Sequence, residues 1–255
     1  MVNLTGVSSS AFTHLVCVSG GSMPVQISPG LLALKDVDWR RVHFFFCDER
    51  VVPFNSPDST YGVYKNLLFD RLPGLPTENV HKICVEGSAA EAAAKYQSDI
   101  MAFFGTEHGY PAFDLLLLGI GPDGHTCSLF PNHKLLSVED LIVAPITDSP
   151  KPPPNRVTLT LPVINKSKHV AFLVAGRNKA EAVTRLRAYV FGRASCQDGE
   201  EPFWLTFEEQ SDLCRAKEHI GGVCVEKCGL FVIFLLNAPT SFPPLKERPG
   251  QLNVF

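Results

Sequence analysis

The sequence has no large excess of either positive or negative charge. Its 255 residues carry 23 Lys and Arg against 26 Asp and Glu, which gives a formal net charge of −3, and the basic residues form no cluster. A protein that binds a polyanion needs a basic patch, so we expect no nucleic-acid partner. Long apolar runs are lacking too, since the strand-like run at 230–236 is far too short to cross a bilayer. We therefore expect no membrane partner.

Signals for secretion and for a serine nucleophile are also missing. Residues 1–10 contain neither the basic segment nor the apolar stretch of a signal peptide, so we expect a cytoplasmic protein. No Gly-x-Ser-x-Gly motif marks a nucleophilic serine. Eight cysteines are present, but Cys17, Cys47 and Cys127 lie in or beside predicted core strands and loops, which is typical of free thiols in the cytosol.

A metal site is not indicated either. Cys224 and Cys228 are separated by three residues and lie near His219, but this spacing fits no standard zinc site. We therefore expect no metal ion.

The sequence does contain four apolar runs, each followed by a polar or glycine-rich turn. The runs are 12–18, 42–46, 113–118 and 170–174. Helices are predicted between them, notably at 61–72, capped by Asp58 or Ser59, and at the alanine-rich segment 89–104. This alternation predicts an α/β fold with a doubly wound, mainly parallel, Rossmann-like sheet flanked by helices. In such a sheet all four turns emerge along one edge, where ligands bind.

Parts of the chain fit this pattern less well. Pro24, Pro29 and Gly30 are expected to interrupt the helix that should follow the first strand. Residues 157–161 alternate with a period of two, which predicts a strand with one less buried face. After about residue 183 the only recognisable element is the strand-like run 230–236, so we divide the chain into an α/β core, 1–183, and a divergent segment, 184–255, whose order the sequence leaves open.

The third turn carries the strongest chemical signal. It follows the run 113–118, which is expected to be buried on both faces, and begins Gly-Ile-Gly-Pro-Asp-Gly-His at Gly119. Its glycines and proline impose an unusual backbone path that delivers Asp123 and His125 to the edge of the sheet. An imidazole with a carboxylate two residues away can be held in one tautomer and can move protons near neutral pH.

Groups at the other turns could hold an anion. The candidates are Gly20, Gly21, Ser22, Arg50 and Lys179. They offer backbone N–H groups, a hydroxyl and two cations, and Arg suits bidentate contact with phosphate or carboxylate. A proline-rich connector, 149–154, brings Lys151 and Arg156 toward the same edge, with Arg156 the better ligand candidate. Each group alone is a weak signal, but together they indicate a small phosphorylated metabolite.

These motifs, in this order, resemble those of the 6-phosphogluconolactonases, and of the animal enzymes in particular. The matching segments are 19–22, 47–54, 58–62, 113–131 and 149–162. The resemblance covers roughly residues 12–183, without the helices that precede the first strand in the family, so the core is expected to be truncated at its N-terminus. Related glucosamine-6-phosphate deaminases carry Gly-His-Ile-Ala-Phe-Asn-Glu in the third turn, where this chain has Gly-His-Thr-Cys-Ser-Leu-Phe from Gly124 onward.

The resemblance implies hydrolysis of 6-phosphogluconolactone to 6-phosphogluconate in the pentose phosphate pathway, by a monomer that needs no cofactor. His125 would be the general base and Asp123 its support, with glycine-loop N–H groups stabilising the oxyanion. The implied ligands of the phosphorylated sugar lactone are Gly20, Gly21, Ser22, Arg50, Gly124, Arg156 and Lys179. Two alternatives stay open: a related sugar-phosphate isomerase or deaminase, and a catalytically impaired protein that binds phosphosugars or partner proteins.

Overall fold

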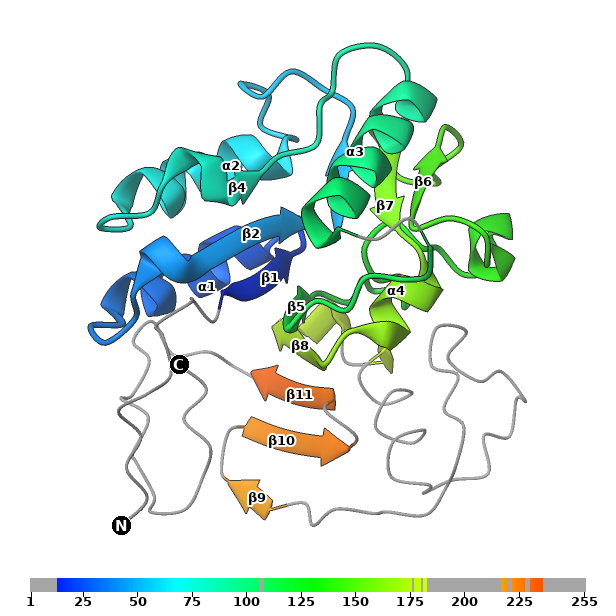
Figure 1. Ribbon diagram of the computed structural model, residues 1–255. Helices are drawn as coiled ribbons and strands as arrows, with labels where there is room; N and C mark the ends of the chain where they lie inside the picture. Colours follow the sequence, from blue (N-terminus) through cyan, green and yellow to red (C-terminus); the bar gives the residue numbers. More distant parts are fainter. Residues whose placement is uncertain are drawn as a thin grey trace.

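A mainly parallel sheet forms the centre of the computed structural model, which describes residues 13–105, 108–175, 177–179 and 181–182 and the backbone of three strands within 217–235. The sheet has eight strands in the order β4-β2-β1-β5-β8-β11-β10-β9 (Figure 1). Their bounds are β1 His14–Val18, β2 Val42–Phe46, β4 Val80–His81, β5 Leu115–Leu118, β8 His169–Ala175, β9 Lys217–His219, β10 Gly222–Lys227 and β11 Leu230–Leu235. Neighbours from β4 to β11 pair in parallel, whereas β10 pairs antiparallel with both β11 and β9. The predicted doubly wound α/β fold is confirmed.

Side-chain caps start two of the helices that flank this sheet. The flanking helices are α1 Met23–Ala33, α2 Thr60–Leu67, α3 Ala89–Phe104 and α4 Leu161–Lys166, with 3₁₀ turns at Trp39–Arg41, Phe69–Arg71, Thr77–Asn79, Lys134–Ser137 and Arg177–Lys179. Ser59 caps α2 by accepting a hydrogen bond from the Gly62 N–H at 3.0 Å. A reciprocal capping box between Ser88 and Glu91 starts α3. The predicted helix 61–72 is instead α2 followed by a separate 3₁₀ turn.

Helix α1 corrects the expectation that prolines interrupt the first crossover. Pro24 lies in the first turn of α1, where its missing N–H would have had no helical partner. Pro29 lies inside the helix and costs it one hydrogen bond. The helix persists because Met23 and Ile27, one turn apart, are both buried in the core. Burial of this apolar stripe outweighs the local penalty.

A second, three-stranded antiparallel sheet was not predicted. It consists of β3 Asp48–Arg50, β7 Arg156–Leu159 and β6 Val143–Ile146, in that order. Helix α3 packs against both β6 and β7 (Figure 1). The prediction of one less buried face at 157–161 is therefore wrong, because all four residues of β7 are buried. The period-two pattern reflects alternating Thr and aliphatic side chains, both of which this central strand buries.

The hydrophobic core lies around the five parallel strands β4, β2, β1, β5 and β8. Leu116 and Leu118 of β5 are buried, whereas Leu115 and Leu117 are half-buried, so the expectation of full burial on both faces holds for one face only. Cys17, Cys47 and Cys127 are free, buried thiols, as predicted.

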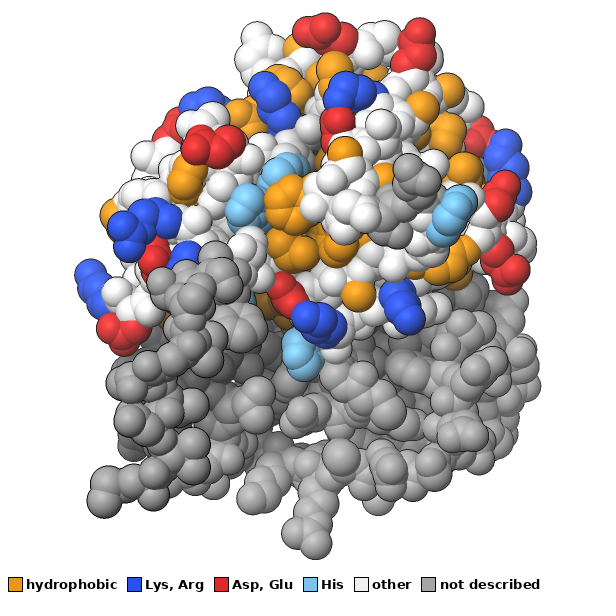
Figure 2. Space-filling model, in the orientation of Figure 1, with side chains coloured by type: hydrophobic (Ala, Val, Ile, Leu, Met, Phe, Trp, Pro, Cys, Tyr) orange, Lys and Arg blue, Asp and Glu red, His pale blue; other side chains and the backbone are white. Residues whose placement is uncertain are grey.

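Beyond residue 183, β11 confirms the strand-like run at 230–236, while β9 and β10 were not anticipated. All three strands belong to the main sheet, and the division of the chain near residue 183 stays a prediction. Among the described residues no helix is long and apolar enough to cross a membrane. Figure 2 shows Lys and Arg interspersed with Asp and Glu over the described part of one face, in keeping with the low net charge of the chain.

Candidate functional site

The site lies where the sheet reverses its strand order. Strand β1 has β2 on one side and β5 on the other, and both pair with it in parallel. The turns after β1, β2, β5 and β8 therefore emerge at one edge, and the first and third of them flank the point of reversal. Crevices at such switch points are where open α/β sheets bind ligands. The predicted convergence of the four turns is confirmed.

The turn after β5 presents a histidine–carboxylate pair. Nδ1 of His125 lies 2.6 Å from Oδ1 of Asp123. The loop closes on itself, since the Gly121 N–H donates to the His125 carbonyl at 2.8 Å and the Gly124 N–H donates to the Gly121 carbonyl at 3.0 Å. These two N–H groups are thereby used inside the loop, so neither is free to stabilise the oxyanion, and the N–H of Gly124 is not free to bind the sugar lactone. On its other side the imidazole packs on Phe130, with 4.7 Å between ring centroids.

The environment keeps the imidazole of His125 neutral. Burial lowers its pKa below the usual 6.5, and the neighbouring Asp123 carboxylate opposes this shift only in part. Burial by itself raises the pKa of Asp123, but hydrogen bonds from Lys151 and His125 lower it to about 2. At neutral pH the pair is therefore a neutral imidazole and a carboxylate. Because Nδ1 faces Asp123, Nε2 is the ring nitrogen that can accept a proton.

Lys151 lies against the same pair. Its Nζ is 2.8 Å from Oδ1 of Asp123 and 3.1 Å from Nδ1 of His125. The sequence suggested Lys151 only as a weak ligand candidate near the cleft. The structure places its ammonium group in contact with both members of the pair.

Arg156, by contrast, is buried beneath the proline-rich connector. Only 2% of its surface is exposed, and its guanidinium donates to the carbonyls of Pro153 at 2.9 Å, Lys151 at 2.9 Å and Pro152 at 3.2 Å. A further contact of 3.4 Å reaches Ser128 Oγ. These contacts assign Arg156 to shaping the connector, and none of them leads toward a ligand. The sequence could not predict this structural role of Arg156, because its partners are backbone carbonyls, which every residue carries.

Arg50 is only half-buried, so a ligand can reach it more easily than it can reach Arg156. One of its Nη atoms donates to the Asp58 carbonyl at 2.9 Å, but its Nε is buried without a hydrogen-bond partner. In the β3–β7 register Arg50 stands opposite Arg156, whose pKa is lowered first by burial and then by the charge of Arg50. Two facing cations and an unpaired buried donor are features of a site that an anion would complete.

The remaining predicted residues lie at the turns after β1 and β8. Gly20 is packed so closely on helix α2 that a Cβ would lie 2.5 Å from Thr60 Oγ1. Ser22 directly precedes α1, and its exposed Oγ accepts a hydrogen bond from Gln26. Lys179 is half-buried in the turn after β8, and burial followed by the charge of Lys151 lowers its pKa. Lys179 and Lys151, which come from separate segments of the chain, therefore lie near enough for their charges to interact.

Glu49 was missed by the sequence analysis. It is 1% exposed, and its carboxylate accepts hydrogen bonds from the N–H groups of Arg50 at 2.8 Å, Thr60 at 2.7 Å and Tyr61 at 2.8 Å. Burial raises the pKa of Glu49, and these N–H groups oppose the shift. The carboxylate ties the start of α2 to β3 and so fixes the backbone on which Arg50 is carried. In the sequence, the only indication of this role is that Glu49 is an acidic residue directly before Arg50.

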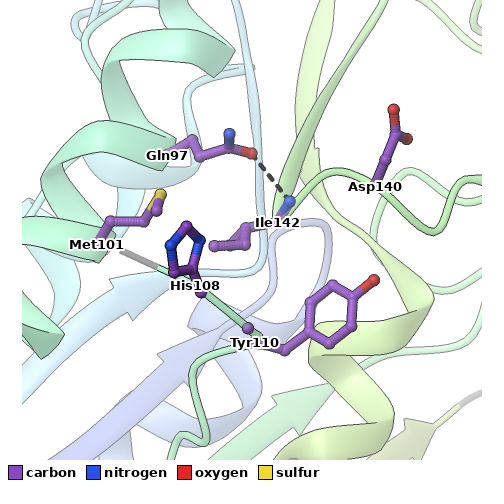
Figure 3. A pocket seen from close by; sticks show the side chains of 7 residues that line it. Gln97, Met101, His108, Tyr110, Asp140 and Ile142 are labelled. Carbon is purple, nitrogen blue, oxygen red and sulfur yellow. Dashed lines mark hydrogen bonds between the residues drawn. The ribbon is translucent and has the colours of Figure 1, made fainter. Parts of the chain in front are cut away.

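Two other kinds of site find no support in the described part of the chain. No group of three His, Cys, Asp or Glu side chains is placed to hold a metal ion there. A hollow of about 310 Å³ lies between α3 and the segments 108–110 and 140–142, and none of the residues discussed above lines it (Figure 3). Two of its polar side chains already have partners, since Gln97 Oε1 accepts from the N–H groups of Ile142 at 2.9 Å and Val143 at 3.1 Å, and the Tyr110 hydroxyl donates to the Glu139 carbonyl.

Comparisons with known proteins agree with this geometry. The family described as glucosamine-6-phosphate isomerases/6-phosphogluconolactonase matches residues 5–210. Human 6-phosphogluconolactonase is 52% identical over 172 residues, which cover 68% of this chain and 64% of the human protein. The bovine 6-phosphogluconolactonase is 49% identical over 176 residues, 66% of each chain. The matched part of the chain therefore spans just under two thirds of these relatives.

The solved structures give the same fold. The crystal structure of 6-phosphogluconolactonase from Thermotoga maritima superposes with a TM-score of 0.66 at 28% identity and covers 89% of this chain and 87% of that one. A further relative, 44% identical, is a chloroplastic 6-phosphogluconolactonase of Arabidopsis thaliana. That alignment covers 68% of this chain and 55% of the plant protein.

Proposed function

We propose that this chain, which belongs to the family of glucosamine-6-phosphate isomerases and 6-phosphogluconolactonases, hydrolyses 6-phospho-D-glucono-1,5-lactone to 6-phospho-D-gluconate in the pentose phosphate pathway. The observation that carries the proposal is the neutral imidazole of His125, which is held through Nδ1 by Asp123 at the edge of the sheet. A lactone hydrolase needs a base of this kind to activate water.

In the proposed reaction Nε2 of His125 takes a proton from a water molecule while the water oxygen attacks the lactone carbonyl. The bond between the carbonyl carbon and the ring oxygen then breaks, and the imidazolium returns the proton to that oxygen. Asp123 stabilises the imidazolium through its contact with Nδ1. Because the same group acts as base and then as acid, the protein needs no second proton donor.

The phosphate group would bind between the turns after β1, β2 and β8. Lys179 and Arg50 supply positive charge, and Gly20, Gly21 and Ser22 lead into the N-terminus of α1, where backbone N–H groups favour an anion. The unpaired Nε of Arg50 supports this assignment, since a phosphate oxygen would give it the partner that it lacks. We further propose a cytoplasmic monomer.

The direct test is a coupled assay of the purified chain with freshly prepared lactone, corrected for spontaneous hydrolysis, and with His125→Gln as the control. Turnover above the spontaneous rate that the substitution removes would support the proposal. Ammonia release from glucosamine-6-phosphate would favour the deaminase alternative. Binding of 6-phosphogluconate without turnover would identify a catalytically impaired protein.

A further inference from the structure

We propose that Lys151 is a positioning residue for His125: its ammonium group holds the Asp123 carboxylate against Nδ1, so that Nε2 stays the basic atom. This inference rests on the proposed function, in which His125 Nε2 activates water. The carrying observation is that two nitrogen atoms meet at one carboxylate oxygen. Oδ1 of Asp123 lies 2.6 Å from Nδ1 of His125 and 2.8 Å from Nζ of Lys151.

The hydrogen bonds around Oδ1 of Asp123 determine which ring nitrogen of His125 carries the proton. If Nδ1 carried no proton, its lone pair would face a carboxylate oxygen at 2.6 Å, two acceptors in contact with no hydrogen between them. With the proton on Nδ1, both Nδ1 and the Lys151 ammonium donate to Oδ1, and each donor has an acceptor. The 3.1 Å approach of Nζ to Nδ1 is then a contact between two donors that share this oxygen. The arrangement leaves the lone pair of the imidazole on Nε2.

The backbone of Lys151 is held from two sides. Its N–H donates to Ser149 Oγ at 3.2 Å, and its carbonyl accepts from the Ser149 hydroxyl at 2.8 Å and from the Arg156 guanidinium at 2.9 Å. Arg156 is in turn 3.4 Å from Ser128 Oγ, whose hydroxyl donates to Asp48 at 2.9 Å. The buried Arg156 therefore sets the position from which the Lys151 side chain reaches the pair.

The charge of Lys151 has a consequence that can be measured on His125. A cation 3.1 Å from the ring disfavours the imidazolium, and it is one of the causes that lower the pKa of His125 after burial. Removal of this charge by itself would raise the pKa of His125. If Lys151 also holds the Asp123 carboxylate, whose side chain is 37% exposed, its removal lets that carboxylate turn into solvent. The pKa of His125 should then fall, because the contact with Asp123 raises it more than the charge of Lys151 lowers it. A cation that only binds the substrate would have the first effect and not the second.

The test is an NMR titration of the His125 imidazole in the substrate-free protein, combined with steady-state kinetics. Lys151→Met is expected to lower the titration midpoint by about 0.5 to 1 pH unit, because Asp123 is no longer held against Nδ1, and to lower kcat about tenfold with a smaller change in KM. Lys151→Arg keeps the charge and is expected to return the midpoint toward that of the unsubstituted chain. Lys168→Met is the matched control, because Lys168 also pairs with an aspartate, Asp114, at 2.7 Å. Its removal should leave the His125 midpoint unchanged.

The outcomes separate this inference from the proposed function. An unmoved or raised midpoint in Lys151→Met, in a chain that still hydrolyses the lactone, would overturn the role of Lys151 and leave the function intact. A raised KM with unchanged kcat would overturn it too, by making Lys151 a substrate ligand. A lowered midpoint in a chain without lactonase activity would support the positioning while the function failed. If Lys151→Met does not fold, the same readings are taken on Lys151→Gln.

Discussion

A Cβ atom on Gly121 would lie 2.1 Å from Nδ1 of His125. The same Cβ would lie 2.5 Å from Oδ1 of Asp123, so it would intrude on both partners of the contact between imidazole and carboxylate. The glycine is therefore a steric requirement of the histidine–carboxylate pair. The pair can close only over a backbone that carries no side chain at this position.

We predict that Gly121→Ala lowers kcat by about 100-fold or more, because a displacement of about 1 Å in a reacting group can cost that much. Gly119→Ala is the matched control in the same loop, since its Cβ would have only an ordinary contact of 3.8 Å with the Met23 side chain. Circular dichroism would show that both variants fold. Equal activity of the two variants would contradict the steric argument.

Substitution of the base itself should remove chemistry and spare binding. His125→Gln is expected to lower kcat by about 10²- to 10⁴-fold, the usual contribution of a general base, with little change in the affinity for 6-phosphogluconate measured by calorimetry. His133→Gln serves as the control, because Nε2 of His133 also contacts an aspartate, Asp148, at 3.1 Å. Retention of more than half of the original kcat in His125→Gln would exclude His125 from the mechanism.

The pH profile follows from the direction of the His125 pKa. Burial lowers this pKa below 6.5, so the base form predominates at neutral pH and is lost only as the pH falls further. We predict that kcat/KM is constant from pH 8 to about 6.5 and declines below that value. Unphosphorylated gluconolactone, assayed in parallel, separates this decline from ionisation of the substrate phosphate. A midpoint above pH 7 would contradict the assignment.

The anion site predicts a difference between two substrates. Lys179→Ala and Arg50→Ala should each raise KM for the phosphorylated lactone by about tenfold or more, since a charge-assisted hydrogen bond contributes about 1.5 to 3 kcal/mol. The KM for unphosphorylated gluconolactone should change much less, because it offers no anionic partner. Lys179 is the sharper test, since Arg50 also supports the Asp58 carbonyl. Equal damage to both substrates in Lys179→Ala would place the phosphate elsewhere.

The buried carboxylate of Glu49 predicts an effect on stability. Glu49→Ala leaves three backbone N–H groups without their acceptor and should lower the free energy of unfolding by about 2 to 4 kcal/mol in a denaturant titration. Glu91→Ala removes an exposed capping-box carboxylate and should lower the free energy of unfolding much less. Similar losses in the two variants would show that water replaces the carboxylate of Glu49.

Local sequence was enough to determine the main parallel strands, helix α3 and the chemistry of the third turn. Strand β2 and helix α3 have the predicted bounds, because an apolar run between polar turns and an alanine-rich segment between Ser88 and Gly105 leave few alternatives. The Gly-Pro-rich turn delivers His125 beside Asp123 because both lie within one short loop. Strand–helix alternation also predicts that the four turns meet at one edge, since parallel strands all point the same way.

Only the tertiary structure decided which charged residues act on the pair and which serve the fold. Lys151 and Asp123 are 28 positions apart, and Arg156 and Ser128 are also 28 positions apart. No period or spacing relates such positions, because their contacts arise when β7 pairs with β3 beside the main sheet. Packing also overrode local preference in α1, where the burial of Met23 and Ile27 keeps a helix that contains Pro29. Propensity acts over a few neighbouring residues, whereas burial and charge pairing depend on the whole fold.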